Sequence, residues 1–377
     1  MKLKTLFAFL VLPFLSNTLA AQNVMHDEHP SLSIGSAAPD FSLPGVDGKT
    51  YSLASFKNAK VLVIVFTCNH CPTAQAYEDR LIRLTKDYAA KGVSVVAINP
   101  NTPSSITLDE LGYTDMSDTY DEMKIRAKEK KFNFPYLYDG KTEATSRLYG
   151  PVATPHVFIF DSKRKLRYSG RIDDVEKPSK TPNKFDTKNA IEALLAGNPV
   201  PVETTKVFGC SIKWAEKNEW VAKLRKEWAE EPVTLDSITV AGMKDLLKNN
   251  SGKLRLINVW ATWCGPCVAE FSDFITINRM YRRRDFEFVS ISADDPGRYA
   301  KALQFLKSEQ ASSTNYIFGS EDKYQLMDAI DPKWPGALPY TILVEPGGKI
   351  VYAKQGPVDA KLLKKLIVDN PLIGRYY

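Results

Sequence analysis

Four of the five cysteines in this 377-residue chain form two Cys-x-x-Cys pairs, Cys68/Cys71 and Cys264/Cys267. A cysteine thiolate attacks a disulfide bond, and a second thiol one helical turn further on can attack the mixed disulfide and release the partner. The spacing therefore predicts thiol–disulfide exchange at both pairs. In the second pair we expect Cys264 to attack the partner and Cys267 to resolve the mixed disulfide.

The elements expected around each pair are those that would activate a thiol. Apolar runs predict buried strands at 61–66 and 254–260, and helical patterns follow both pairs, over 74–91 in the first half. At a strand-to-helix junction, unpaired backbone N–H groups and the helix dipole favour the thiolate and lower its pKa. Pro266 suits the first turn of such a helix, where a missing N–H leaves no partner unsatisfied.

Metal binding is the main alternative for the first pair. Cys68, His70 and Cys71 could together hold a soft metal, and the protein would then be a metal- or haem-delivery module. A four-cysteine zinc site needs two pairs that converge, whereas these pairs fall in separate predicted domains. Covalent haem needs His directly after the second cysteine, where Pro72 and Val268 stand. We therefore predict redox-active disulfides with no metal and no other cofactor.

The two halves of the chain repeat one order of elements. In each half the pair and its helix are followed by another strand, and later by a proline that introduces the next strand, Pro155 or Pro339. This order predicts an α/β protein of two thioredoxin-like folds, each a central mixed sheet flanked by helices. We place the folds at 31–200 and 232–370, joined by a linker helix at 201–231.

Two segments stand outside the repeat. Residues 100–133 are polar and predict an insertion in the first half. The linker carries Trp220, Leu224 and Trp228 at a spacing of four, which predicts one apolar helix face. This face either packs on one of the domains or forms a docking surface for another protein.

The N-terminus is typical of a secretory signal peptide over residues 1–20. Lys2 and Lys4 precede an apolar run at 6–15, and small residues end at Ala20, near which we expect cleavage. The run is too short for a membrane span, although an uncleaved anchor is the alternative. We therefore predict an exported, periplasmic protein with no stable membrane insertion after cleavage, in a compartment where thiols tend to be oxidised.

The composition excludes several classes of protein. Hydrophobic residues make up 44% and charged residues 25%, which is ordinary for a globular chain. Five cysteines are too few for a disulfide scaffold, and a net charge of +6 without a long basic run gives no reason to expect nucleic-acid binding. The partners we expect are protein disulfide substrates and a thiol–disulfide electron donor, either soluble or membrane-bound.

The second half carries Trp-Ala-Thr-Trp-Cys-Gly-Pro-Cys-Val-Ala-Glu at 260–270 and Leu-Pro-Tyr-Thr at 338–341. Through these motifs, residues 232–370 resemble the exported thioredoxin-like reductases of the TlpA/ResA type. The resemblance implies that Pro339 is a cis-proline facing the cysteine pair and that its strand, with Leu338, binds partner backbone. It also implies an acidic residue, Glu270, just inside the active-site helix. The residues expected to support this pair are Trp263, Gly265, Pro266 and Glu270.

Residues 33–200 resemble the AhpC/TSA branch of redoxins. Gly-x-x-Ala-Pro-Asp-Phe at 35–41 and Cys-Pro-Thr at 71–73 carry the resemblance, which makes a thiol-dependent peroxidase a further alternative. However, Cys68 stands where peroxiredoxins have Thr, and the preceding proline is absent. The Cys-Asn-His-Cys form is closer to oxidising thioredoxin-like proteins, in which a residue such as His70 stabilises the first thiolate. Thr154 and Pro155 would be the cis-proline pair of this domain.

Cys210 is the one cysteine outside the pairs. Its segment, Phe-Gly-Cys-Ser-Ile-Lys-Trp at 208–214, resembles the C-terminal tail of the same branch. Cys210 is either a third redox thiol that exchanges with Cys68 or Cys71, or a buried free thiol. The sequence as a whole predicts an exported thiol–disulfide oxidoreductase that reduces or exchanges protein disulfides.

Overall fold

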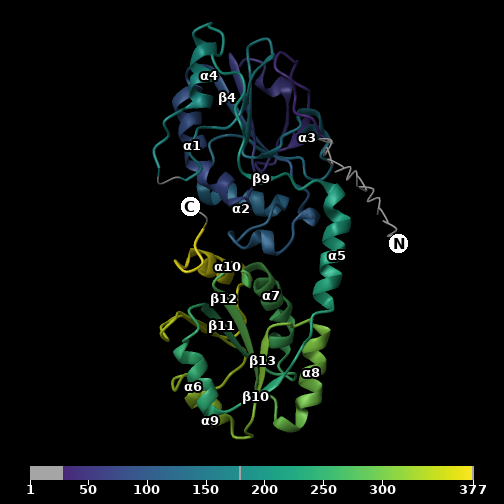
Figure 1. Cartoon of the computed structure of the whole chain (residues 1–377), viewed down its shortest axis with the longest axis vertical. Helices are drawn as coiled ribbons and strands as arrows, with labels where there is room; N and C mark the ends of the chain where they lie inside the picture. Colours follow the sequence, from purple (N-terminus) through teal and green to yellow (C-terminus); the bar gives the residue numbers. More distant parts are fainter. Residues whose placement is uncertain (1–28, 178–179, 376–377) are drawn as a thin grey trace, which may run out of the picture.

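The computed structural model describes residues 29–177 and 180–375, so the expected signal peptide and its cleavage site lie outside the described residues. Two α/β lobes follow one another along the chain and along the long axis of the molecule (Figure 1). Among the described residues, no helix is both long and apolar enough to cross a membrane.

The first domain is built on a five-stranded sheet in the order β5-β4-β3-β7-β8. All residues of the central strand β3 are buried, because helices α1 and α4 cover one face while α3 and the N-terminal strands cover the other. The strands are β1 Ser42–Pro44, β2 Thr50–Ser52, β3 Val61–Phe66, β4 Val93–Asn99, β5 Tyr136–Tyr138, β6 Ala153–Thr154, β7 His156–Phe160 and β8 Leu166–Gly170. The helices are α1 Pro72–Ala89, α2 Tyr120–Lys130, α3 Ala144–Tyr149 and α4 Asp186–Leu195.

The second domain is built on a six-stranded sheet in the order β10-β13-β12-β11-β14-β15. Helices α7, α8 and α10 pack on one face, and α6 and α9 on the other. The strands are β10 Asp236–Ile238, β11 Leu254–Trp260, β12 Phe286–Ser292, β13 Thr314–Phe318, β14 Tyr340–Val344 and β15 Ile350–Gln355. The helices are α6 Val240–Lys248, α7 Gly265–Tyr281, α8 Tyr299–Ser308, α9 Lys323–Ile330 and α10 Ala360–Asp369.

In both sheets the central strand is parallel to one neighbour and antiparallel to the other, and the cysteine pair follows the central strand. This confirms the predicted pair of thioredoxin-like folds. Both central strands occupy the residues that their apolar runs predicted.

The predicted insertion joins the two domains. Ile106 and Leu111 belong to the first domain, yet they lie in the hydrophobic core that α7 covers in the second. The hydroxyl of Tyr281, the last residue of α7, donates to the carbonyl of Thr114 at 2.7 Å, and Arg375 pairs with Asp115 at 2.9 Å. The C-terminal end of α7 therefore faces the first domain.

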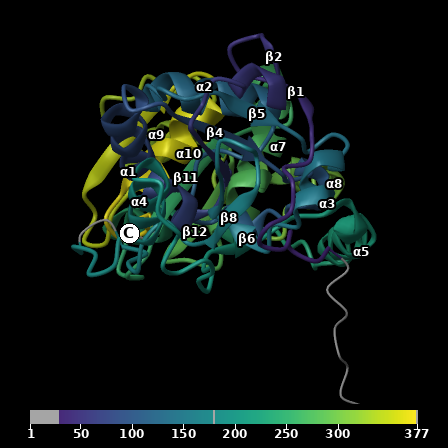
Figure 2. The ribbon, with the colours of Figure 1, turned by 90° about the horizontal axis from the view of Figure 1, so that it is seen from above.

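The linker differs from the predicted helix over 201–231. Only α5, Asn218–Ala229, is an α-helix, and the chain before it runs back along the first domain through the short strand β9, Cys210–Ser211. The helix α5 runs along the side of the molecule (Figures 1 and 2). It buries Val221 and Trp228, whereas Trp220 is 54% exposed. The predicted apolar face is therefore wrong at Trp220, because the neighbouring Val221 is buried in its place.

Candidate functional site

The second domain holds its cysteine pair at the start of α7. Cys264 is the N-cap residue, and its Sγ accepts a hydrogen bond from the backbone N–H of Cys267 at 3.3 Å. The two sulfurs form a disulfide. Gly265 and Pro266 are the first two helical residues, which is where a proline is tolerated because its N–H is missing. A helix N-terminus stabilises a thiolate at Cys264 when this disulfide is reduced.

The predicted proline loop lies at the end of the strand beside this pair. The Leu338–Pro339 bond is cis, and Tyr340, which follows it, pairs with Val259 of the central strand β11. Leu338 packs against the hydrophobic cluster that contains both cysteines. Trp263, directly before Cys264, is 60% exposed. The exposed side chain of Trp263 therefore offers a protein partner an apolar contact beside the pair.

Glu270 is a buried acid one helical turn beyond Cys267. Its Oε2 accepts a hydrogen bond from the Val358 backbone N–H at 2.8 Å, and its Oε1 is buried without a partner among the described residues. Burial raises the pKa of Glu270 above its ordinary value. A carboxyl group in this position can take up and return the proton of a thiol.

The first domain places its cysteines differently from the sequence prediction. Cys71, rather than Cys68, is the N-cap of α1, and its Sγ accepts a hydrogen bond from the Ala74 N–H at 3.4 Å. Pro72 is the first helical residue. Cys71 thus occupies the position that Cys264 has in the second domain, and Cys68 lies before the helix.

Cys68 and Cys71 are free thiols buried against the other cis-proline loop. Cys68 lies 3.2 Å from the Thr154 hydroxyl, Cys71 as a thiol donates to the Thr154 carbonyl at 3.2 Å, and the Thr154–Pro155 bond is cis. Burial raises the pKa of Cys68. Burial also opposes ionisation of Cys71, but hydrogen bonds from Cys210 and Cys68 and the neighbouring His70 hold the pKa of Cys71 well below its ordinary value.

His70 is oriented by Asp118, a residue that the sequence reasoning missed. His70 Nδ1 lies 2.6 Å from Asp118 Oδ2, and the backbone N–H groups of Asn69 and His70 donate to Asp118 Oδ1 at 2.8 and 3.0 Å. Burial disfavours a charged imidazole, yet the carboxylate raises the pKa of His70. Asp118 comes from the polar insertion, and no spacing in the sequence connects it with His70.

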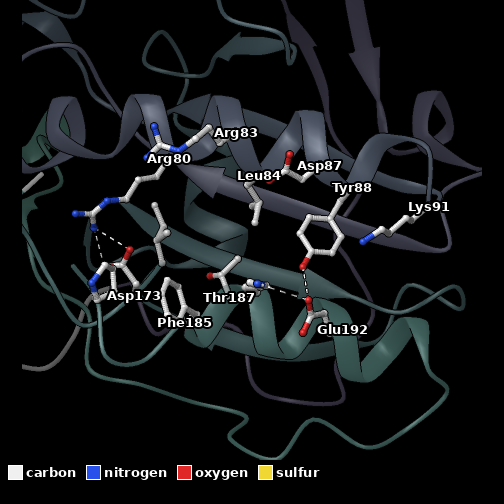
Figure 3. A pocket seen from close by; sticks show the side chains of 13 residues that line it. Arg80, Arg83, Leu84, Asp87, Tyr88, Lys91, Asp173, Phe185, Thr187 and Glu192 are labelled. Carbon is white, nitrogen blue, oxygen red and sulfur yellow. Dashed lines mark hydrogen bonds and ion pairs between the residues drawn. The ribbon is translucent and has the colours of Figure 1, made fainter. Parts of the chain in front are cut away.

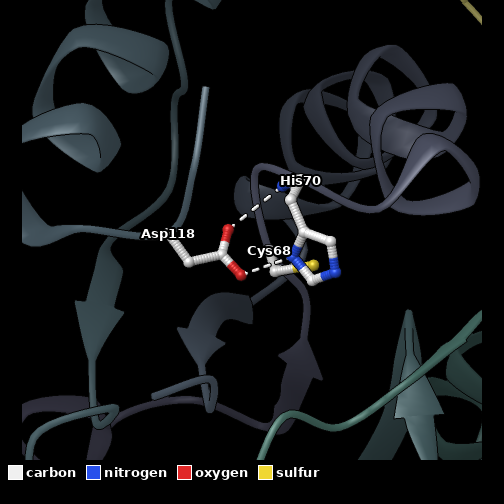
Figure 4. A group of neighbouring side chains, drawn as sticks. All are labelled: Cys68, His70 and Asp118. Carbon is white, nitrogen blue, oxygen red and sulfur yellow. Dashed lines mark hydrogen bonds and ion pairs between the residues drawn. The ribbon is translucent and has the colours of Figure 1, made fainter. Parts of the chain in front are cut away.

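Cys68, His70 and Asp118 have potential ligand atoms within 4.8 Å of one another (Figure 4). This set shares Cys68 and His70 with the predicted metal site, and it has the carboxylate of Asp118 in place of Cys71. His70 Nε2 is buried without a partner among the described residues. A histidine held by a carboxylate through Nδ1 and open at Nε2 can be a metal ligand, and it can equally act as a base or a charge beside a thiolate.

Cys210 lies beside this pair although it is far from it in the sequence. Strand β9 pairs antiparallel with β6, so that Cys210 stands opposite Thr154. Cys210 packs on the buried cluster that contains Cys68 and Cys71. The structure therefore brings together the three cysteines for which the sequence suggested exchange.

A cavity of about 450 Å³ lies between α1 and α4 (Figure 3). Several of its polar and charged side chains interact with one another. Arg80 binds Asp173 at 2.7 and 2.8 Å, and the Tyr88 hydroxyl donates to Glu192 at 2.6 Å. Among the described residues, no cysteine lines this cavity.

Both halves of the chain match family models. The AhpC/TSA family model matches residues 34–169, and the Redoxin model matches residues 233–369. Thioredoxin-like protein YneN of Bacillus subtilis is 30% identical over 154 residues, covering 41% of this chain and 77% of YneN.

Two further similarities are weaker or partial. Thiol-disulfide oxidoreductase ResA of Bacillus subtilis is 26% identical over 122 residues, covering 32% of this chain and 64% of ResA, which is just under two thirds of its length. The crystal structure of an uncharacterized conserved protein from Geobacillus kaustophilus is 39% identical, covering 48% of this chain and 92% of that chain, with a TM-score of 0.42.

Proposed function

Because the chain belongs to the thioredoxin-like redoxins, with an AhpC/TSA domain followed by a Redoxin domain, we propose that it is a thiol–disulfide oxidoreductase acting on protein disulfides. The observation that carries this proposal is the Cys264–Cys267 disulfide at the N-terminus of α7, beside the cis-proline loop and the exposed Trp263. The name of the relative ResA supports the same activity.

In the reducing direction, the Cys264 thiolate attacks one sulfur of a partner disulfide. The partner's other sulfur leaves as a thiolate and takes a proton from solvent. Cys267 then passes its proton to Glu270 and attacks the sulfur of Cys264, so that the Cys264–Cys267 disulfide forms. The partner's second sulfur leaves as a thiolate and takes the proton from Glu270, which completes the partner dithiol. An external thiol donor restores the reduced pair. The direction of net electron flow depends on the potentials of the pair and its partners.

In the first domain, Cys71 is the thiol with the environment of a nucleophile and Cys68 is its neighbour. The helix N-terminus, the hydrogen bonds to Cys71 and the His70–Asp118 pair all favour a Cys71 thiolate. Both thiols are almost inaccessible, Cys68 being 3% and Cys71 0% exposed. The first domain would therefore hold a dithiol of its own, Cys68 and Cys71, which outside partners reach by a different route from that to Cys264 and Cys267.

For location and partners the proposal follows the sequence. An exported, periplasmic protein would meet protein disulfides and a thiol–disulfide donor, soluble or membrane-bound, and would need no cofactor besides its own cysteines. The charged and apolar pattern of residues 1–20 supports export.

Metal binding by the first domain is a second candidate function, favoured by the grouping of Cys68, His70 and Asp118. Elemental analysis of protein purified under reducing conditions separates the two functions. Stoichiometric copper or zinc that is lost in a His70→Ala variant would favour metal delivery.

The reductase proposal is tested by insulin reduction with dithiothreitol as donor. We expect the wild-type chain to accelerate the reduction and Cys264→Ser to fall to the rate without protein, because the attacking sulfur is gone. Cys68→Ser is the matched control, since it makes the same change at a buried thiol of the other domain. Wild-type activity in Cys264→Ser would refute the assignment.

A further inference from the structure

The three thiols of the first domain differ in their access to solvent. Cys71 shares a buried cluster with Cys68, Cys210 packs against that cluster, and Cys71 is completely buried. Cys68 is nearly so, whereas Cys210 is partly exposed and lines an open cavity of about 450 Å³. Among the cysteines of this domain, all of which the structure describes, Cys210 alone lines that cavity. A thiol or disulfide from outside therefore meets Cys210 first.

The segment that carries Cys210 is held firmly against the buried pair. It pairs with β6 through Thr154, the residue whose hydroxyl and carbonyl also contact Cys68 and Cys71. A Cβ at Gly209 would lie 2.0 Å from the Thr154 carbonyl oxygen, so only glycine permits this approach. After Cys210, the Lys213 backbone N–H donates to Asn101 Oδ1 at 2.9 Å. The contact between Cys210 and Cys71 is thus fixed from both sides.

The cavity next to Cys210 has a mixed polar and apolar lining and has room for a small thiol or an extended cysteine of a partner. His70 lines it, as do Glu110 and the buried Lys213, whose ammonium group donates to Glu110 at 2.5 Å. This lining offers hydrogen bonds, the paired charges of Lys213 and Glu110, and apolar surface that includes Pro72.

We propose that Cys210 is the exchange thiol of the first domain, which forms a disulfide with Cys71 and passes electrons between the buried pair and a dithiol outside. The inference rests on the proposed dithiol chemistry of this domain. It assigns to Cys210 a function that neither cysteine of the pair can perform while β9 stays in place.

The steps balance as two-electron exchanges. In the oxidised Cys68–Cys71 form, Cys210 gives up its proton to solvent and attacks the sulfur of Cys71. The Cys68–Cys71 bond breaks, the Cys71–Cys210 disulfide forms, and Cys68 leaves as a thiolate and takes up a proton. A thiolate of the external dithiol then attacks the accessible sulfur of Cys210, and Cys71 leaves as a thiolate at its helix N-terminus. The second thiol of the donor attacks the mixed disulfide, so that Cys210 is released as a thiol. The donor is oxidised to a disulfide, and the domain has gained two electrons.

The first test maps the predicted disulfide in the full-length Cys68→Ser variant, which leaves Cys71 and Cys210 unchanged. After oxidation with diamide and trypsin digestion, we expect peptide 61–80 linked to peptide 207–213. If these peptides stay unlinked while the Cys264–Cys267 disulfide forms in the same sample, the proposal is overturned.

The second test measures how fast dithiothreitol reduces the oxidised first pair, by quenching with acid and labelling the thiols at each time. Cys210→Ser should slow this reduction by at least about tenfold, because direct attack on a buried disulfide is sterically hindered. Ser162→Ala, at an exposed residue of the first domain outside this cavity, is the control and should keep the wild-type rate.

Two results separate failure of this inference from failure of the proposed function. A wild-type rate in a folded Cys210→Ser variant overturns the role of Cys210 and leaves the dithiol chemistry intact. A wild-type chain in which Cys68 and Cys71 never oxidise overturns both the role of Cys210 and the redox function of this domain. The Cys264–Cys267 pair, read in the same samples, reports on the second domain independently.

Discussion

At the scale of single residues, the reactivity of each cysteine follows from its place at a helix rather than from its place in a motif. Cys71 and Cys264 are both N-caps, and each accepts a backbone N–H hydrogen bond from the first turn. Cys264, the first cysteine of its pair, and Cys71, the second cysteine of its pair, are therefore in equivalent positions at a helix N-terminus. A shared Cys-x-x-Cys spacing cannot reveal this difference, although Pro72 next to Cys71 is a signal for a helix that starts there.

The buried acid of the second domain gives a prediction for stability against pH. Burial raises the pKa of Glu270, so the folded chain keeps this proton at a pH where the unfolded chain has lost it. The free energy of unfolding must then fall as the pH rises from the ordinary carboxyl pKa through the folded-state value.

We expect Glu270→Gln to remove this fall. The variant should match the wild type near pH 4 and have a higher Tm at pH 8. The increase should be roughly 2–4 °C for each kcal/mol that burying the charged Glu270 carboxylate costs the folded wild type. Thermal unfolding at both pH values measures this, with Asp273→Asn, an exposed acid of the same helix, as control. Equal Tm differences at pH 4 and pH 8 would contradict the buried-acid interpretation.

At the scale of elements, the strong sequence signals were reliable and the weak ones were not. The apolar runs located the two central strands at their observed bounds, because strands buried on both faces need such runs. The linker was predicted to be a helix over 201–231, but Cys210 and Ser211 within it form β9. A two-residue strand has no periodicity, and its position depends on β6, which lies far away in the sequence.

The β6–β9 pair makes a prediction at Gly209. A Cβ there would lie 2.0 Å from a backbone oxygen, and the φ of +139° is unfavourable for any other residue, so Gly209→Ala should detach β9. We expect the free energy of unfolding to fall by about 2 kcal/mol or more. Alkylation of Cys71 by iodoacetamide should become faster because β9 no longer covers it.

Gly252→Ala is the control for this substitution. Its φ of +74° also favours glycine, but nothing lies within 4 Å of the added Cβ, so it should lower stability by only about 1 kcal/mol and leave Cys71 protected. If the two variants had the same stability and the same rate of Cys71 alkylation, the claim that the close approach at Gly209 holds β9 in place would be contradicted.

At the scale of the whole molecule, the two thiol sites are set apart. Helix α7 contacts the first domain at its C-terminal end, where Tyr281 binds Thr114, and Cys264 lies at its other end. Seventeen helical residues span about 25 Å at 1.5 Å per residue. On the other side of the contact, Gln75 of α1 donates to the same Thr114 at 2.9 Å. In this arrangement each site would exchange electrons with its own outside partner.

The domain contact itself could not be predicted from the sequence. The repeat of strand, cysteine pair, helix and proline predicted two folds in order along the chain. However, Ile106 and Leu111 lie in a segment whose polar composition gave no sign that it contributes to the core of the other domain. Similarly, Asp118 reaches His70 only through the folded insertion.

The central claim is that Cys264 is the sulfur that attacks partner disulfides, and disulfide trapping tests it most directly. Full-length Cys267→Ser and Cys264→Ser variants would be reduced, incubated with an oxidised disulfide protein and separated without reductant. We predict that Cys267→Ser accumulates a mixed disulfide through Cys264, because its resolving thiol is gone, and that Cys264→Ser accumulates little. Equal trapping by both variants, or a mixed disulfide that maps to Cys267 in Cys264→Ser at the same yield, would contradict the account.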